Sequence, residues 1–194
     1  GVGLGLRFRP DPGWHGYWSN PGDAGQGMVL EWQLPPGWQA GDPRYPMPQL
    51  LLISGLMNHV FEGEHAVLVP LAVPADAVAG RSYQVAVFAR WLSCSDRLCV
   101  PQWASLRASV TVGADGTSDP RFDGWRAALV PQLDRPAQFA LTPAALRIAI
   151  PLPASLTLTD PHVFVGEIGL VDYAAPQSFT RQGDLLVAAI PRKG

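Results

Sequence analysis

Apolar residues recur at every second position along much of the chain, most clearly over residues 83–91. The apolar positions of that stretch are Tyr83, Val85, Val87, Ala89 and Trp91. A period of two in residues that favour β structure is typical of a strand buried mainly on one face. We therefore predict a central strand over these residues.

Shorter stretches with the same period lie on both sides of this strand, and clusters of glycine and proline separate them. These predicted strands cover residues 2–8, 28–34, 50–53, 65–73 and 106–112. Residues 55–64 have Gly55 and Gly63 near their ends, and we predict an exposed loop there. Short strands at regular spacing predict an antiparallel sandwich of immunoglobulin-like size.

A polar joint over residues 113–119, rich in glycine, serine and aspartate, marks the best domain boundary. A helix is predicted to begin at Pro120 and to end before Pro131. Further short strands are predicted over residues 138–141, 146–150, 162–165, 177–181 and 185–190. The predicted fold class is all-β: an immunoglobulin-like antiparallel sandwich over residues 1–113, followed by a smaller β-rich module with one short helix over residues 114–194.

The composition argues against several function classes. Charged residues make up only 15% of the chain, and a formal net charge of −2 gives no reason to expect nucleic acid or an anionic membrane surface as a partner. No apolar run approaches the roughly 18–20 residues of a membrane span. The chain begins directly with a strand and shows no signal peptide, so we expect a mature or excised segment of a longer protein.

The chain contains two cysteines, Cys94 and Cys99, which follow the central strand. Five positions is an odd step, so on one continuous strand their side chains would face opposite ways. They can meet only if residues 95–98 turn the chain back, which makes them near-opposite partners in a hairpin. We predict this hairpin, with a disulfide in the oxidised protein. Val100 and Pro101 are predicted to end its pairing, because proline donates no ladder hydrogen bond.

The residues alone leave two functions open for this bridge, a structural staple and a redox-active pair. A loop this short contributes only roughly 2 kcal/mol by the chain-entropy formula, and a chain of 194 residues can bury a sizeable core without it. Asp96 and Arg97 can bias thiolate formation, which favours redox chemistry. The redox-active pair and the structural staple are therefore about equally well supported. Metal binding is the weakest alternative, because no further cysteine or histidine lies at ligand spacing around the pair.

Other residues that can carry chemistry give weaker signals. The histidines are His15, His59, His65 and His162, and no two of them have the spacing of a metal-binding pair. We expect each to be an ordinary surface or core histidine. Glu62 and Glu64 flank Gly63 and could form a carboxylate pair, but a solvated loop explains them better.

Several stretches, taken in their fixed order, resemble one known family. They are residues 14–25, 56–58, 61–64, 91–96, 99–101 and 167–177. Over nearly its whole length, the chain resembles the periplasmic N-terminal domain of the transmembrane thiol:disulfide interchange reductases. Both the DsbD type and the suppressor-of-copper-sensitivity B type (ScsB) share these stretches, and the last stretch is similar to an extension found in the latter.

The resemblance implies an immunoglobulin-like domain with one redox-active cysteine pair and with no metal or organic cofactor. Carried onto this chain, Cys99 would form the mixed disulfide with partner proteins, and Cys94 would resolve it. Asp96 lies in the turn between them.

Four further residues would surround this pair by the same resemblance. Phe61 aligns with the aromatic tip of a cap loop that shields the cysteines. His59 stands just before it, where the best-known branch of the family has an acidic residue. His15 and Tyr17 fall where that branch places active-site tyrosines.

In that family, the domain takes electrons from the thioredoxin-like domain of its own reductase and passes them to thioredoxin-like periplasmic proteins. The resemblance therefore implies a protein-disulfide reductase domain in the bacterial periplasm, joined to the inner membrane through a domain outside this chain and without a nucleic-acid partner. The alternative is a non-catalytic immunoglobulin-like binding module with a structural hairpin disulfide. Mild reductant should open a redox pair with little loss of melting temperature, whereas a staple should resist or unfold.

Overall fold

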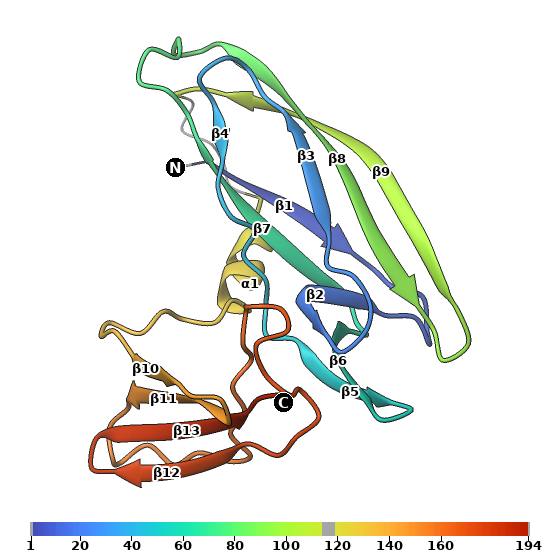
Figure 1. The fold of residues 1–194 in the computed structure, drawn as a ribbon. Coiled ribbons are helices and arrows are strands. Elements are labelled where there is room, and N and C mark those ends of the chain that lie inside the picture. The colour runs from blue at the N-terminus through green and yellow to red at the C-terminus, as the bar shows by residue number, and fades with distance from the viewer. Residues whose placement is uncertain (1, 114–118, 194) are drawn as a thin grey trace. The chain divides into compact units, whose positions relative to one another are not determined.

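Nearly all of the regular secondary structure in the described residues is β-strand, with one short helix (Figure 1). The structure is a computed structural model that describes residues 2–113 and 119–193. Its elements in those residues are β1 (Val2–Phe8), β2 (Gly16–Gly22), β3 (Val29–Gln33), β4 (Gln39–Ala40), β5 (Gln49–Ile53), β6 (Leu56–Phe61), β7 (His65–Ala72), β8 (Ser82–Cys94), β9 (Cys99–Thr111), α1 (Arg121–Ala127), β10 (Gln138–Leu141), β11 (Ala145–Pro151), β12 (Ser178–Gln182) and β13 (Leu185–Pro191). The predicted all-β class is confirmed.

The chain divides into two compact units, and neither is one continuous stretch. The first unit comprises residues 1–19, 25–50 and 59–130, and the second comprises residues 20–24, 51–58 and 131–194. Strands β2, β5 and β6 form one sheet, in the order β2-β6-β5. The predicted division after Gly113 stays a prediction, and residues 114–118 of its joint lie outside the described residues.

The first unit contains two antiparallel three-stranded sheets, with strand orders β1-β7-β4 and β3-β8-β9. Residues of both sheets share the same apolar clusters, as expected for a sandwich. The buried members of these clusters are Leu6, Val67, Val69, Val87, Trp38, Leu71, Val85 and Val110. Within the predicted central strand, the buried positions of β8 are Val85, Val87 and Ala89, so its predicted apolar side faces the core.

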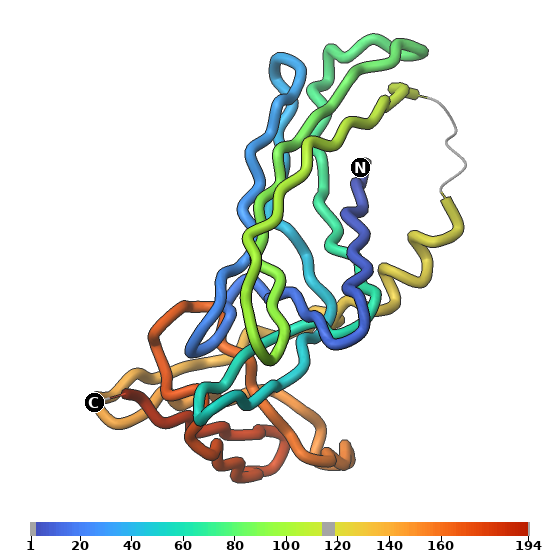
Figure 2. The backbone as a smooth tube through the Cα atoms, turned by 90° about the vertical axis from the view of Figure 1, so that its right-hand side faces the viewer, coloured from blue at the N-terminus to red at the C-terminus, as the bar shows by residue number. Residues whose placement is uncertain are grey.

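The longest element pair is the hairpin of β8 and β9, which Figure 2 shows as two long tubes, green and yellow-green, that run side by side. Its register runs without interruption from Ser82 opposite Thr111 to Cys94 opposite Cys99. The prediction that Val100 and Pro101 end the pairing is wrong, because Pro101 lies within the ladder opposite Leu92.

The predicted exposed loop over residues 55–64 is also largely wrong. Residues 56–61 form β6, and its last four residues, Asn58 to Phe61, are all buried. A strand buried on both faces shows no alternation, which hides it from a search for a period of two. Only residues 62–64 form an exposed turn before β7.

Helix α1 belongs to the first unit, whereas we predicted it within the second module. The Asp119 carboxylate accepts the Arg121 backbone N–H at 3.0 Å and fixes the start of the helix. Trp125 and Phe122 pack over Gly5 of β1, where a Cβ would approach the Trp125 ring to 2.6 Å. The glycine therefore makes room for the apolar face of the helix.

The second unit is built on the sheet β10-β11-β13-β12. Its apolar cluster consists of Leu146, Val165, Val171, Tyr173 and Ile190. The strand predicted over residues 162–165 is absent from this described segment. Instead, the Gln177 side chain bonds both backbone groups of Val163, accepting from its N–H at 2.8 Å and donating to its C=O at 3.0 Å. The Gln177 side chain thus makes the hydrogen bonds that the backbone of a neighbouring strand would make.

Candidate functional site

The two cysteines form a disulfide at the tip of the β8–β9 hairpin. Cys94 ends β8 and Cys99 begins β9, with their Cα atoms 4.0 Å apart. The turn between them is closed by a hydrogen bond from the Ser95 N–H to the Leu98 C=O at 2.9 Å. The Ser95 hydroxyl also accepts the N–H groups of Arg97 and Leu98 at 3.3 Å. The predicted hairpin and disulfide are therefore confirmed.

The two cysteines differ sharply in their exposure. Cys94 is only 2% exposed, whereas Cys99 is an exposed residue. The backbone of His15 pairs with Cys94 on the side away from β9, through N–H···O bonds of 2.8 and 3.0 Å. Cys94 thus lies in the interior of the sheet, and Cys99 lies on its edge strand. An approaching molecule can reach Cys99 first.

His15, whose backbone pairs with Cys94, contacts Tyr17 through its side chain. The His15 Nε2 atom and the Tyr17 hydroxyl are 3.4 Å apart, and their rings meet edge to face at 5.3 Å. Burial lowers the pKa of His15, because the imidazolium ion loses its hydration, and the nearby charge of Glu62 partly opposes this effect. Burial also raises the pKa of Tyr17. Both side chains are therefore neutral at pH 7.

Gly25 sets the position of Tyr17. It has φ = +94°, and a Cβ on this residue would clash with the Tyr17 ring. Glycine adopts this left-handed conformation without a steric penalty. The turn that follows β2 can therefore pass directly over the ring.

Phe61 lies in a row of five aromatic rings in contact, which we call the aromatic row: Trp91, Phe8, His65, Phe61 and Tyr45. The Trp91 ring meets Phe8 edge to face, and the other neighbouring pairs are stacked. The successive ring centroids are 5.5, 5.2, 4.3 and 6.3 Å apart. Phe61 is only 4% exposed, so the expectation of an exposed aromatic loop tip is wrong. Burial raises the pKa of Tyr45 to about 12 and lowers that of His65.

The first unit contains a cavity of about 470 Å³ beside this row. Its aromatic lining comprises Phe8, Trp14, Tyr17, Tyr45, His65 and Trp91. Ser93 and Gln102 of the hairpin also line it. Side chains alternate between the two faces along a strand. Cys94 follows Ser93 directly and pairs with Cys99, so both cysteine side chains project to the other face of the hairpin.

His59 and Asp96 differ in their surroundings. His59 is 1% exposed, and its ring meets Trp18 at 5.8 Å. Asp96 lies at the hairpin tip and faces Arg97 at 3.9 Å, with both side chains more than four-fifths exposed. An ion pair of this kind contributes little. The turn sequence therefore offers little electrostatic bias toward a thiolate.

Sequence reasoning missed the chemical setting of Glu62 and His65. Glu62, which we assigned to a solvated loop, acts on the charge state of His15. His65 stacks between Phe8 and Phe61, and its Nδ1 lies 3.0 Å from the Gly63 carbonyl. The proximity of residues 62–65 to the first strands could not be read from spacing, because it arises from long-range pairing of β1 with β7.

Other sites are not indicated within the described parts of the chain. Among residues 2–113 and 119–193, no three histidine, cysteine, aspartate or glutamate side chains gather in a way that would hold a metal ion. The helix in those residues is too short to cross a membrane.

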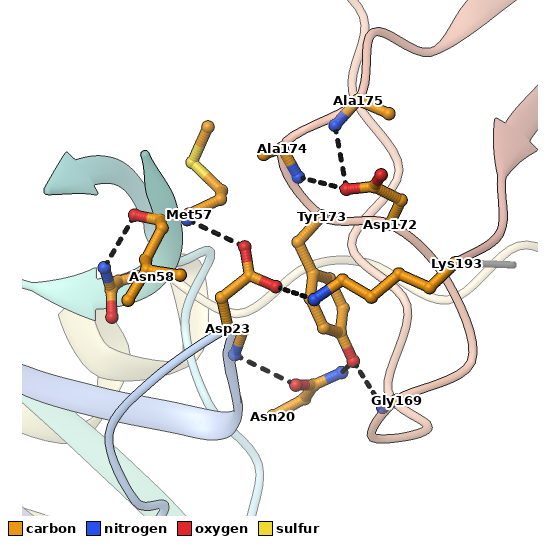
Figure 3. A network of polar contacts seen from close by, with 12 residues as sticks. Asn20, Asp23, Met57, Asn58, Gly169, Asp172, Tyr173, Ala174, Ala175 and Lys193 are labelled. Atoms are coloured by element: carbon orange, nitrogen blue, oxygen red, sulfur yellow. Dashed lines mark hydrogen bonds and ion pairs between the residues drawn. The ribbon is translucent and has the colours of Figure 1, made fainter. Parts of the chain in front are cut away.

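Several residues of the stretches that resemble the family lie in the second unit, where they form a buried polar network (Figure 3). Asn20 is 0% exposed, and its amide donates to the Val165 and Glu167 carbonyls at 2.7 and 3.1 Å and contacts the Tyr173 hydroxyl at 3.0 Å. That hydroxyl accepts the Gly169 N–H at 2.7 Å. Asn20 thus holds the loop that carries Tyr173.

Asp23 continues this network. Its side chain is 3% exposed, accepts the Met57 N–H at 2.9 Å and pairs with Lys193. Three stretches that are far apart in sequence, around residues 20–24, 57 and 193, are thereby joined within the second unit. The residues carried by the resemblance therefore serve two purposes, because some surround the disulfide and others stabilise the fold.

The comparisons with known proteins agree with this geometry. The family described as "Thiol:disulfide interchange protein DsbD, N-terminal" matches residues 1–110, more than half of the chain. The crystal structure of the N-terminal periplasmic domain of ScsB from Proteus mirabilis is similar in fold, with a TM-score of 0.61, 15% sequence identity and coverage of 97% of this chain and 72% of that one. No curated protein matched the sequence. The matched residues include the whole disulfide hairpin tip, and the chain belongs to the family of DsbD N-terminal thiol:disulfide interchange domains.

Proposed function

We propose that this domain passes electrons from a membrane reductase system to partner proteins in the bacterial periplasm through the Cys94–Cys99 pair. The partners would be thioredoxin-like periplasmic proteins and the thioredoxin-like domain of the same reductase. Membership of the thiol:disulfide interchange family supports the reaction type. The description of the ScsB domain as periplasmic supports the compartment.

The observation that carries the proposal is the unequal exposure of the two cysteines. Disulfide exchange requires a thiolate to reach a sulfur along an open path. Cys99 is exposed on an edge strand, whereas Cys94 is buried in the interior of the same sheet. This asymmetry supports attack on partners by Cys99 and resolution by Cys94.

The exchange then proceeds in two balanced steps. In the first step, the Cys99 thiolate attacks one sulfur of the partner disulfide, forms a mixed disulfide and releases the partner's other sulfur as a thiolate. In the second, the Cys94 thiolate attacks the Cys99 sulfur, closes the Cys94–Cys99 disulfide and releases the partner's remaining thiolate. The partner gains two electrons, and its two thiolates take up protons from water. The domain regains its dithiol by the reverse steps with its own reductase.

The neutral side chains beside Cys94 suit the second step. The backbone of His15 pairs with Cys94, and the His15 ring contacts the Tyr17 hydroxyl. We propose that these two residues position the resolving cysteine.

A structural staple is a poorer account of this bridge. The hairpin already pairs over thirteen residues on each strand, and the disulfide closes only its last pair. A six-residue loop adds about 2 kcal/mol by the chain-entropy formula. The ladder keeps the hairpin in place without the bond, so opening it should leave the fold intact.

A trapping experiment tests the assignment. The Cys94→Ser variant, reduced and mixed with an oxidised thioredoxin-like protein, should accumulate a mixed disulfide that survives non-reducing electrophoresis. The Cys99→Ser variant is its matched control and should trap none, because its remaining sulfur is buried. Trapping by Cys99→Ser alone would reverse the two roles. Failure of both variants, with wild-type protein equally inert, would overturn the proposed function.

A further inference from the structure

The strand that carries Cys99 has an open outer edge. In the sheet order β3-β8-β9, strand β9 is the last, and it runs for thirteen residues. Only Val110 is buried in it, and most of its residues are exposed. Long open edges can pair with a strand from another molecule, and proteins usually shield them.

The direction of the free backbone groups follows from the hairpin register. Beyond the tip, Ser95 donates to Leu98, and at the far end Val112 donates to the Arg81 carbonyl at 3.1 Å. Both pairs continue the register of the ladder between them without a break. In an antiparallel pair, hydrogen-bonded and non-hydrogen-bonded positions alternate. The even-numbered residues of β9 therefore bond to β8, and the odd-numbered residues direct their backbone groups outward.

This alternation explains why the ladder tolerates Pro101. Its position is one where the N–H would point away from β8, so the missing donor removes no bond from the hairpin. The residues with outward-facing backbone groups are Cys99, Pro101, Trp103, Ser105, Arg107, Ser109 and Thr111. Pro101 provides a carbonyl alone, and the others provide both a donor and an acceptor.

The same positions also share one face for their side chains. Trp103 therefore lies on the face of Cys99, four residues or about 13 Å along the strand. It is 67% exposed, which is unusual for a large aromatic residue outside a binding surface. An anchor for apolar contact thus accompanies the reactive sulfur.

We propose that the extended segment flanking the partner's reacting cysteine adds to β9 as a further strand, and that Trp103 packs against it. The inference rests on the proposed function, since the exchange step itself determines the occupant. When the partner's sulfur bonds to Cys99, the backbone beside that sulfur must lie next to the open end of β9. There it meets outward N–H and C=O groups, as in other complexes formed by strand addition.

Two proline substitutions separate this docking mode from a contact through the sulfur alone. Ser105→Pro removes an outward N–H about 20 Å from Cys99 along the strand, and Ser109→Pro removes one about 33 Å from it. Neither donor serves the hairpin ladder, so both variants should keep the fold, as Pro101 does. Ser109→Pro is therefore a matched control for Ser105→Pro.

The reaction should be measured with a protein probe and a small probe that share one leaving group. The full chain carrying Cys94→Ser is reacted with a thioredoxin whose exposed cysteine holds 5-thio-2-nitrobenzoate, and separately with 5,5′-dithiobis(2-nitrobenzoate). Ser105→Pro should slow the protein reaction about fivefold, the factor that corresponds to one backbone hydrogen bond. Its reaction with the small probe should stay unchanged, and Ser109→Pro should leave both rates unchanged.

A second pair of variants guards against a proline that disturbs folding. Trp103→Ala should slow the protein reaction about tenfold or more, while Val78→Ala, another exposed apolar residue of the first unit, should not. Equal rates for Ser105→Pro and Ser109→Pro, with Trp103→Ala unaffected, would overturn the docking mode. A dimer of the parent protein that Ser105→Pro dissociates would instead assign the edge to a second copy and overturn it too. A parent protein that reacts with the small probe but never with thioredoxin would refute the proposed function itself.

Discussion

The disulfide tip of the hairpin and the polar network around Asn20 and Asp23 use similar residue types for opposite purposes. At the tip, Cys99 and the turn residues face solvent, and the side-chain bonds of Ser95 serve only the turn. In the network, Asn20 and Asp23 are buried, and their side chains bond backbone groups from distant stretches. Stability and reactivity therefore belong to different residues, although the resemblance to the family drew on both sets.

The first prediction is that Phe61, like the buried network residues, stabilises the fold. Because its ring is 4% exposed and stacks on His65 and Tyr45, Phe61→Ala should lower the free energy of unfolding by about 3–5 kcal/mol. Urea denaturation measures this loss. Phe139, which is 76% exposed, offers a matched control, and Phe139→Ala should change stability by less than about 0.5 kcal/mol. Equal effects of the two substitutions would show that Phe61 does not support the core.

The second prediction tests the network itself. Asn20→Asp keeps an oxygen for the Gly22 N–H but removes the amide that donates to the Val165 and Glu167 carbonyls. Unfolding free energy should fall by about 3 kcal/mol, because buried polar groups lose partners and a carboxylate faces carbonyl oxygens. The rate at which dithiothreitol opens the disulfide should not change. A large change in that rate at preserved stability would break the comparison.

The third prediction concerns the disulfide. Replacing both cysteines by alanine, or reducing the bond, should lower the free energy of unfolding by only about 2 kcal/mol, because the closed loop is short and the ladder persists. Thermal melts of oxidised, reduced and Cys94→Ala/Cys99→Ala protein give the values. Unfolding at room temperature after reduction would identify the bond as a staple and support the binding-module alternative.

The smallest expected effect is a pH dependence from His15 and His65. Burial lowers the pKa of both side chains in the folded state, so the unfolded chain takes up protons first as the pH falls. Their contribution to stability is therefore complete above the ordinary histidine pKa of about 6.5 and declines as the pH falls below it. Melting temperatures between pH 7.5 and 5 should show this decline. His15→Gln should reduce its slope, and an unchanged slope in both His15→Gln and His65→Gln would contradict the assignment.

The sequence predicted the features that depend on local pattern. The period of two located β8 and most other strands, and the odd spacing of Cys94 and Cys99 correctly required a turn between them. The search for a period of two failed at β6, where residues on both faces are buried and no alternation exists. Sequence reasoning also misjudged Pro101, since proline is harmful or harmless in a strand according to which side its missing N–H would face.

Long-range pairing explains the remaining failures. The second unit gathers residues 20–24 and 51–58 with the C-terminal part of the chain, and composition gives no sign of this. The environment of His15 also depends on pairing between residues that are far apart in sequence. The resemblance placed it near the cysteines, but its backbone pairing with Cys94 became visible only with the strands in place.

The unbroken hairpin register has a kinetic consequence for the lifetime of any mixed disulfide. The ladder holds Cys94 opposite Cys99 whether or not the two sulfurs are bonded, with Cα atoms 4.0 Å apart in the closed form. The resolving thiol is thus supplied intramolecularly, and well-oriented groups of this kind reach effective molarities of about 10⁵ M or more. A captured partner should therefore be released almost as soon as Cys94 ionises. The protonation state of this one buried sulfur should thus determine the lifetime of each mixed disulfide.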